Sequence, residues 1–144
     1  MIRVLFICVH NGARSQIAEA YLRTFGSEEF FCESAGLEPG ELNPYVVRAL
    51  QEENIDITGK KTQGVMDLLL AGNKYDYVIT VCSKEAQEKC PRFPGIHESL
   101  LWPFPDPATF TGTDEKIMTQ VREVRDAIKE KVWHFHEGVR PVRQ

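Results

Sequence analysis

The chain has 144 residues, of which 42% are hydrophobic and 26% charged, and its formal net charge is −4. This size and composition predict a single globular domain over residues 1–144. An acidic balance without a basic block argues against a nucleic-acid partner. No apolar stretch approaches the roughly 20 residues that a membrane span needs, and the first expected strand begins too early to follow a signal peptide. We therefore expect a cytoplasmic protein with no membrane partner.

Apolar runs and helical periodicity predict strands that alternate with helices. The first half is expected to hold a strand over residues 3–7, a helix over 15–25 with Gly26 as C-cap, a strand over 30–34, and a helix with Asn43 as N-cap and Pro44 at its first position. The second half is expected to hold a helix over 65–71, a strand over 77–81, a loop over 82–95, a weaker strand over 96–101, and a long helix that is capped by Thr113 and ended by Gly138 and Pro141. This alternation predicts an α/β fold with a central parallel four-stranded sheet and helices on both faces.

The segment after the first expected strand carries the clearest chemical signal. Its residues are Cys8, Val9, His10, Asn11, Gly12, Ala13, Arg14 and Ser15. A loop that leads into a helix N-terminus directs backbone N–H groups at one point, and the guanidinium of Arg14 can bind a tetrahedral oxyanion through two hydrogen bonds. The same positive field favours the thiolate of Cys8. The segment therefore predicts covalent chemistry on phosphate or a similar anion.

The positions of the cysteines relative to the expected strands indicate which of them can take part in chemistry. In a reducing compartment, catalytic or redox roles are more common than structural disulfides. Cys8 and Cys82 each follow a strand, so both are expected at the carboxyl edge of the sheet, where Asp106 can join them. Cys32 lies within a strand and is expected in the core. No cysteine or histidine pair has the spacing of zinc ligands, so no metal is expected.

Together these residues resemble the low-molecular-weight protein-tyrosine-phosphatase fold, and specifically its thioredoxin-coupled arsenate reductases. A Cys-x5-Arg-Ser loop near the N-terminus, combined with a late Asp-Pro, is a specific combination. The matching segments extend over nearly the whole chain and comprise the loop with Gln16, Ala18 and Glu19, then Ser34-Ala35-Gly36, Asn43-Pro44, Val81-Cys82, Cys90-Pro91 and Asp106-Pro107-Ala108.

The resemblance implies a reaction and a role for each residue. Cys8 attacks arsenate, Asp106 acts as the general acid, and Arg14 holds the oxyanion with the loop amides. Cys82 then attacks the Cys8 sulfur as arsenite departs, and Cys90 attacks Cys82 to carry the disulfide to where thioredoxin reduces it. The implied partners are thioredoxin and a small oxyanion (arsenate, or phosphate or sulfate as analogues), with no bound cofactor. A low-molecular-weight thiol is the alternative reductant.

Some loop positions have a structural interpretation beside the functional one. Ser15 can act as the N-cap of the following helix, while the resemblance implies a hydrogen bond from it to the Cys8 thiolate. Asn11 suits a left-handed backbone that ties the loop together. His10 is expected to point to solvent. Some members of the family bind potassium near this loop, and three of the matching positions here are Asn11, Glu19 and Ser34.

Cys82 and Cys90 distinguish a reductase from a phosphatase, because water can hydrolyse a phosphocysteine without further thiols. The residues between them are mostly good helix formers. A regular helix would separate the two Cα atoms by about 12 Å, whereas a disulfide needs roughly 4.4–6.8 Å. We hypothesise that this segment is partly helical when reduced and unwinds to form the bond. Small residues after Asp106-Pro107, where the phosphatases carry aromatic ones, favour the reductase over a tyrosine phosphatase or a catalytically silent anion-binding module.

Overall fold

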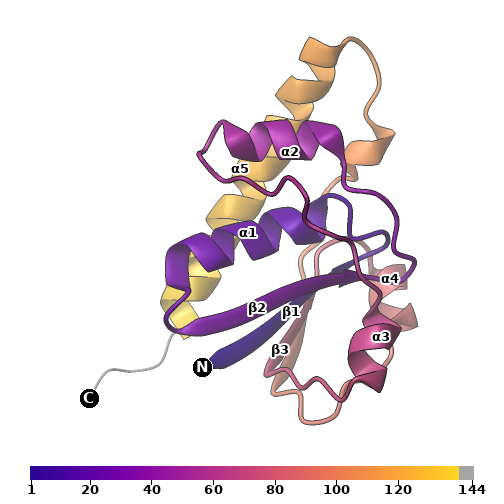
Figure 1. Cartoon of the computed structure of the whole chain (residues 1–144), viewed down its shortest axis with the longest axis vertical. Coiled ribbons are helices and arrows are strands. Elements are labelled where there is room, and N and C mark those ends of the chain that lie inside the picture. The colour runs from indigo at the N-terminus through magenta and orange to yellow at the C-terminus, as the bar shows by residue number, and fades with distance from the viewer. Residues whose placement is uncertain (140–144) are drawn as a thin grey trace.

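The computed structural model describes residues 1–139, and at its centre four parallel strands lie in the order β2-β1-β3-β4 (Figure 1). The strands are β1 (Ile2–Cys8), β2 (Phe30–Gly36), β3 (Tyr77–Thr80) and β4 (Glu98–Leu101). The helices are α1 (Arg14–Gly26), α2 (Pro44–Gln51), α3 (Val65–Leu70), α4 (Lys84–Lys89) and α5 (Asp114–Val139), with a 3₁₀ turn, η1 (Pro107–Thr109). The α/β fold with a parallel four-stranded sheet is thus confirmed.

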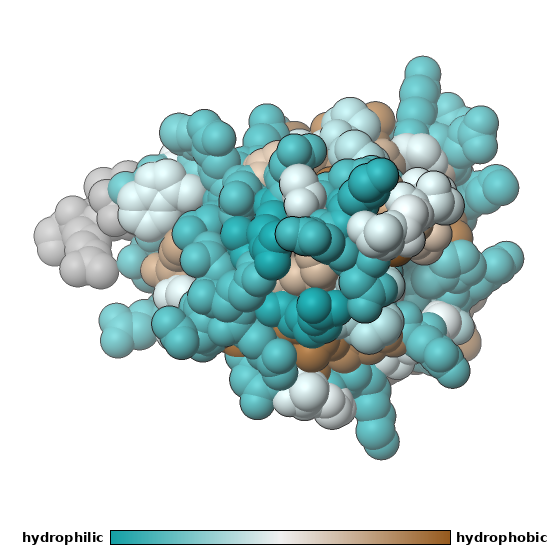
Figure 2. Space-filling view, turned by 90° about the horizontal axis from the view of Figure 1, so that it is seen from above, coloured by the Kyte–Doolittle hydropathy of each residue, from teal (hydrophilic) through white to brown (hydrophobic). Residues whose placement is uncertain are grey.

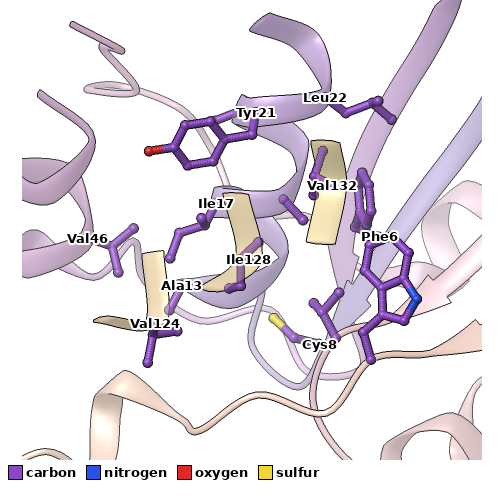
Figure 3. Close-up of a cluster of buried hydrophobic side chains, with 14 of the residues drawn as sticks. Phe6, Cys8, Ala13, Ile17, Tyr21, Leu22, Val46, Val124, Ile128 and Val132 are labelled. Atoms are coloured by element: carbon purple, nitrogen blue, oxygen red, sulfur yellow. The ribbon is translucent and has the colours of Figure 1, made fainter. Parts of the chain in front are cut away.

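Both faces of the sheet are covered, and β1 shows why. Side chains alternate between the two faces of a strand. Val4 and Phe6 join the larger core, which packs against α1, α2 and α5, whereas Leu5 and Ile7 join a smaller core beneath α3. Figure 1 shows α1 and α3 on opposite sides of the sheet. Figure 3 shows the Cys8 sulfur at the margin of the larger core. The end of β1 therefore delivers this thiol to the α1 side of the sheet.

Two helix N-termini are fixed by the caps that the sequence predicts. The Asn43 side chain accepts hydrogen bonds from the backbone N–H groups of Tyr45 (2.9 Å) and Val46 (3.3 Å), and Pro44 follows as the first helical residue of α2. Thr113 Oγ1 accepts from the N–H of Lys116 at 3.2 Å at the start of α5. Both predicted caps are confirmed.

The predicted helix ends are wrong in two places. Gly26 is the last residue of α1 rather than its cap, which is Ser27. Its lack of a side chain serves packing instead, because a Cβ there would lie 2.7 Å from the ring of the buried His136. Helix α5 continues through Gly138 to Val139, and Pro141 lies outside the described residues.

One face of the molecule, seen from above, is mostly polar. Figure 2 shows hydrophilic residues over most of the face seen from above, with apolar residues visible between them. None of the helices within residues 1–139 combines the length and the apolar character that crossing a membrane requires.

Candidate active site

The segment between β1 and α1 forms a closed loop that is held by the chain following β2. The N–H groups of Leu37, Glu38 and Gly40 donate to the carbonyl oxygens of Cys8 (3.2 Å), Val9 (2.8 Å) and His10 (2.9 Å) in turn. Asn11 has a φ of 57°, the left-handed conformation expected for it. Its N–H points back at Cys8 Sγ, 3.2 Å away. The loop therefore curls around the thiol.

Two glycines allow this close packing. A Cβ on Gly36 would lie 2.7 Å from the carbonyl oxygen of Val9 and 2.8 Å from the nitrogen of Asn11. A Cβ on Gly12 would collide with the carbonyl oxygen of Glu41. The loop is thus packed on one side against the end of β2 and on the other against the segment that precedes α2.

Ser15 lies directly against the thiol of Cys8. The distance from its Oγ to Cys8 Sγ is 2.9 Å, and the same Oγ accepts a hydrogen bond from Asn11 Nδ2 at 2.8 Å. Because that contact occupies an acceptor position, the single hydroxyl hydrogen of Ser15 is free to point at the sulfur. The alternative role as N-cap is wrong, since the N-cap position of α1 is Ala13 and no side chain caps this helix.

Arg14 and Asp106 face each other across the mouth of the loop. Arg14 is buried; one of its terminal nitrogens donates to the carbonyl oxygen of Phe104 at 3.1 Å, and the other lies 3.6 Å from Asp106 Oδ2. Within the described chain its buried Nε has no hydrogen-bond partner. The other carboxylate oxygen of Asp106 accepts from the N–H of Ala108 at 2.9 Å, at the start of η1. The guanidinium and the carboxyl group are therefore fixed at one cavity.

That cavity has a volume of about 240 Å³ and is lined by Cys8, His10, Arg14, Asn43, Pro44 and Asp106, among others. His10 is exposed, as expected, but its ring is held in place. Its Nδ1 lies 2.9 Å from the carbonyl oxygen of Glu38, so this nitrogen carries the hydrogen of the neutral ring. The cavity combines a thiol, a guanidinium and a carboxyl group, which suits a small tetrahedral oxyanion.

Cys82 and Cys90 flank the short helix α4. Cys82 follows β3 and is buried, with its Sγ 4.0 Å from the carbonyl oxygen of Ile7. Burial raises the pKa of its thiol. Because Ile7 pairs with Thr80 in the neighbouring strand, Cys82 lies at the same edge of the sheet as Cys8, which lines the cavity. Cys90 is the half-buried C-cap of α4, and burial raises the pKa of its thiol to about 11.

All four cysteines are free in the structure. The Ser83 side chain caps α4 by accepting from the N–H of Ala86 at 3.1 Å. The expectation that this segment is partly helical is confirmed by α4, while its dependence on the redox state and its unwinding stay predictions. Cys32 is buried in β2, as expected, and burial raises the pKa of its thiol to about 11.

Comparison with known proteins agrees with this geometry. Residues 3–144 match the family described as low molecular weight phosphotyrosine protein phosphatase. The chain belongs to this family. An arsenate reductase of Oceanobacillus iheyensis is 37% identical over 132 residues, which cover 92% of this chain and 93% of that protein.

Solved structures extend the similarity to the fold. An arsenate reductase in the phosphate binding state has a TM-score of 0.81 and 27% identity, and the match covers 96% of this chain and 99% of that one. A thioredoxin-dependent arsenate reductase of Corynebacterium glutamicum has a TM-score of 0.63 and 28% identity, and the match covers 94% of this chain and 63% of that one.

The structure of this family member also shows two residues beside the loop, Lys60 and Gln63, that the sequence analysis missed. Gln16 Nε2 donates to the backbone oxygen of Asn11 (3.0 Å) and to its Oδ1 (3.2 Å), while the backbone N–H of Gln63 donates to the same Oδ1 (3.0 Å). Lys60 Nζ in turn donates to Gln16 Oε1 at 3.1 Å. Gln63 and Lys60 are remote in sequence, so only the fold brings them to the loop.

Glu19, one of the positions that match the potassium site of some relatives, is neutralised by the chain itself. Its carboxylate is buried and forms ion pairs with the ammonium of Lys60 and with the guanidinium of Arg23 (2.7 Å). Ser34 Oγ donates to the same carboxylate at 2.7 Å. These residues do not fit a potassium ion, because the Lys60 ammonium already contacts the acidic oxygen that would bind one.

Proposed function

We propose that this protein reduces arsenate to arsenite through a relay of three thiols. The observation that carries the proposal is the pairing of an oxyanion cavity with a buried second thiol, Cys82, beside it and a third, Cys90, at the far end of α4. Relatives that are named arsenate reductases support it. A phosphatase would need the cavity and Cys8 alone.

The first step uses the loop and the groups at its mouth. The backbone N–H groups of the loop and the guanidinium of Arg14 hold three oxygens of arsenate. The Cys8 thiolate forms a sulfur–arsenic bond, and the opposite oxygen leaves as water after Asp106, in its acid form, supplies a proton. The hydrogen bonds from Ser15 and Asn11 hold the sulfur in place for this attack.

The next two steps move electrons and then the disulfide. The Cys82 thiolate attacks Cys8 Sγ, the sulfur–arsenic bond breaks, and its electron pair stays on arsenic, which leaves as arsenite. The Cys90 thiolate then attacks Cys82 Sγ and releases Cys8 as a thiolate. The Cys82–Cys90 disulfide is the oxidised product, and α4 must unwind for it to form.

Thioredoxin is the proposed reductant of that disulfide. The thioredoxin-dependent relative supports this choice, and the position of Cys90 at the end of a surface helix gives a protein reductant access. The cytoplasm is the compartment where thioredoxin keeps cysteines reduced, so the proposal includes a cytoplasmic location.

A low-molecular-weight tyrosine phosphatase is the second candidate, because the family description and the cavity fit it equally well. The residues next to Asp106 argue for the reductase. Ala108, which lines the cavity, is small and provides no aromatic wall for a substrate ring.

The test couples arsenate to NADPH consumption with thioredoxin and thioredoxin reductase. We expect steady turnover in the wild type, and its loss in Cys82→Ser and in Cys90→Ser, with Cys32→Ser as a matched control that retains turnover. Aryl-phosphate hydrolysis that survives both relay substitutions, without arsenate turnover in the wild type, would contradict the proposal and establish the phosphatase.

A further inference from the structure

A continuous line of side-chain hydrogen bonds joins Cys8 to Lys60. Ser15 Oγ lies 2.9 Å from Cys8 Sγ, and Asn11 Nδ2 donates to Ser15 Oγ at 2.8 Å. Gln16 Nε2 donates to Asn11 Oδ1 at 3.2 Å, and Lys60 Nζ donates to Gln16 Oε1 at 3.1 Å. Asn11, Ser15 and Gln16 are buried, so water does not substitute for these partners.

The Asn and Gln side chains alone do not determine which group donates and which accepts at each step of this line of hydrogen bonds. An Asn or Gln side chain carries a donor at one position and an acceptor at the other, and a rotation of 180° exchanges them. A rotated Gln16 would turn its oxygen toward two acceptors on Asn11 and its NH2 toward Lys60. An ammonium only donates, so it excludes the rotated state and fixes Gln16 with its donor facing Asn11.

The orientation of Gln16 in turn affects the orientation of Asn11 and of the Ser15 hydroxyl that faces the Cys8 sulfur. Asn11 Oδ1 accepts from Gln16 Nε2 and from the N–H of Gln63, which leaves its NH2 to face Ser15. Ser15 has one hydrogen, and because its oxygen already accepts from Asn11, that hydrogen is directed to the Cys8 sulfur. The N–H of Gln63 only donates, so it opposes a rotated Asn11 together with Lys60. In the rotated state Ser15 would donate to Asn11 instead, and Cys8 would lose a hydrogen bond.

An ion pair with a buried carboxylate keeps Lys60 in position. Its ammonium forms an ion pair with Glu19, whose side chain is 3% exposed. Glu19 also pairs with Arg23, whose side chain is 56% exposed and which makes no contact with Gln16 in the hydrogen-bond network described above. Lys60 and Arg23 therefore share one carboxylate, but of the two only Lys60 donates a hydrogen bond to Gln16.

We propose that Lys60 is a positioning residue for the reaction: its ammonium, together with the backbone N–H of Gln63, sets the direction of the hydrogen bonds through Gln16, Asn11 and Ser15, so that Ser15 donates to the Cys8 thiolate. The inference rests on the nucleophilic role of Cys8 in the proposed function. It assigns to a lysine outside the cavity an effect on the reactivity of the thiol inside it.

The test measures how fast iodoacetamide alkylates Cys8 as a function of pH, with the modified peptide quantified by mass spectrometry in a buffer without oxyanions. We expect Lys60→Met to slow alkylation at pH 7 by roughly three- to tenfold, because hydrogen bonds to charged groups are worth more than ordinary ones. Arg23→Met is the matched control and should leave the profile unchanged.

A double substitution distinguishes an effect of Lys60 that is transmitted through the hydrogen bonds from a direct electrostatic effect of its charge on Cys8. Ser15→Ala removes the last link, so adding Lys60→Met to it should change Cys8 alkylation no further. Lys60→Arg keeps a donor and a charge, and it should restore most of the wild-type rate. Thermal unfolding of each variant checks that the fold persists, since Arg23 still pairs with Glu19 in Lys60→Met.

The outcomes separate this inference from the proposed function. An unchanged alkylation profile in Lys60→Met, or an equal change in Arg23→Met, would overturn the inference while arsenate turnover in the wild type still supported the reductase. A further loss from Lys60→Met on top of Ser15→Ala would also overturn it. A Lys60-dependent profile in a protein that turns over no arsenate would support the inference and reject the reductase.

Discussion

The two regions that carry the thiols of the proposed relay are built in opposite ways. In the loop around Cys8, Asn11 and Ser15 are fully buried, and their side chains bond to each other and to neighbouring segments. In α4, between Cys82 and Cys90, Ala86 is the buried residue of a six-residue helix. A helix of this length has little stability of its own in water. One region is fixed by many contacts and the other by few.

The difference matches what each region must do in the proposed reaction. Stabilising a charged transition state requires donors that are already in place, so the loop gains from being rigid. Passing a disulfide from Cys82 to Cys90 requires two sulfurs to approach each other, so α4 gains from opening easily. The same enzyme therefore needs a fixed region for the oxyanion and a marginally stable one for the disulfide.

The largest effect is expected from breaking the fixed region at Arg14. Arg14→Lys keeps the charge but loses the planar fork, so we expect kcat/KM for arsenate to fall by roughly 10²- to 10³-fold. Arg23→Lys, on the same helix, is the control and should retain turnover. Steady-state kinetics beside a thermal melt measure both. Near-normal turnover in Arg14→Lys would remove the guanidinium from the mechanism.

A smaller effect, at the movable region, concerns pH. Burial raises the pKa of Cys90 to about 11, so its thiol is protonated at neutral pH and its thiolate fraction grows as pH rises toward that value. Closure of the Cys82–Cys90 bond should therefore accelerate by up to about tenfold per pH unit above neutrality. Acid-quenched single turnovers without thioredoxin measure it, and Cys90→Ser reports the earlier steps. A flat profile would show that Cys90 leaves its buried setting before it attacks.

Removing the N-terminal cap of α4 should have a still smaller effect on the rate at which the Cys82–Cys90 disulfide forms. Ser83→Ala removes the hydrogen bond to the N–H of Ala86, and such a cap is worth about 1 kcal/mol. Because the proposed reaction requires the helix to open, closure of Cys82–Cys90 should become about fivefold faster in the same single-turnover assay. Thr113→Ala removes the corresponding cap of α5 and should leave the rate unchanged. Slower closure in Ser83→Ala would mean that the intact helix assists the attack.

The smallest signal is the unwinding itself. Oxidation of Cys82 and Cys90 should reduce the helical circular dichroism by no more than α4 contributes, and it should remove the amide-exchange protection of α4. The amides of α1 serve as the internal reference and should keep their protection. Equal protection of α4 in both redox states would contradict the opening, and the two regions would then differ less than their contacts indicate.

The sequence predicts the sheet and the chemical groups of the site because both depend on local patterns. Apolar runs mark the strands, Asn43 and Thr113 mark helix starts, and the loop from Cys8 to Ser15 is contiguous. The errors occur where distant residues decide. Gly26 has the character of a cap, but the ring of His136 from α5 determines why it must be small.

The supporting side of the site could not be predicted for the same reason. Lys60 lies in a segment without regular structure, and no local spacing links it to Gln16, its partner across the fold. Ser15 illustrates the limit within the loop itself. A serine at a helix start is usually interpreted as a cap, and the local pattern alone does not indicate the contact with Cys8. The family resemblance implied that contact, and the structure confirms it.

Gly12 and Gly36 carry a consequence for protein engineering. The loop has its shape because the end of β2 and the segment before α2 press on it from two sides, with no space for a methyl group at either glycine. Transplanting the eight-residue motif from Cys8 to Ser15 into another scaffold would therefore fail to reproduce an anion-binding loop. The smallest portable unit includes both supporting segments, and a mutagenesis library aimed at new oxyanions should vary the rim of the cavity while leaving positions 12 and 36 as glycine.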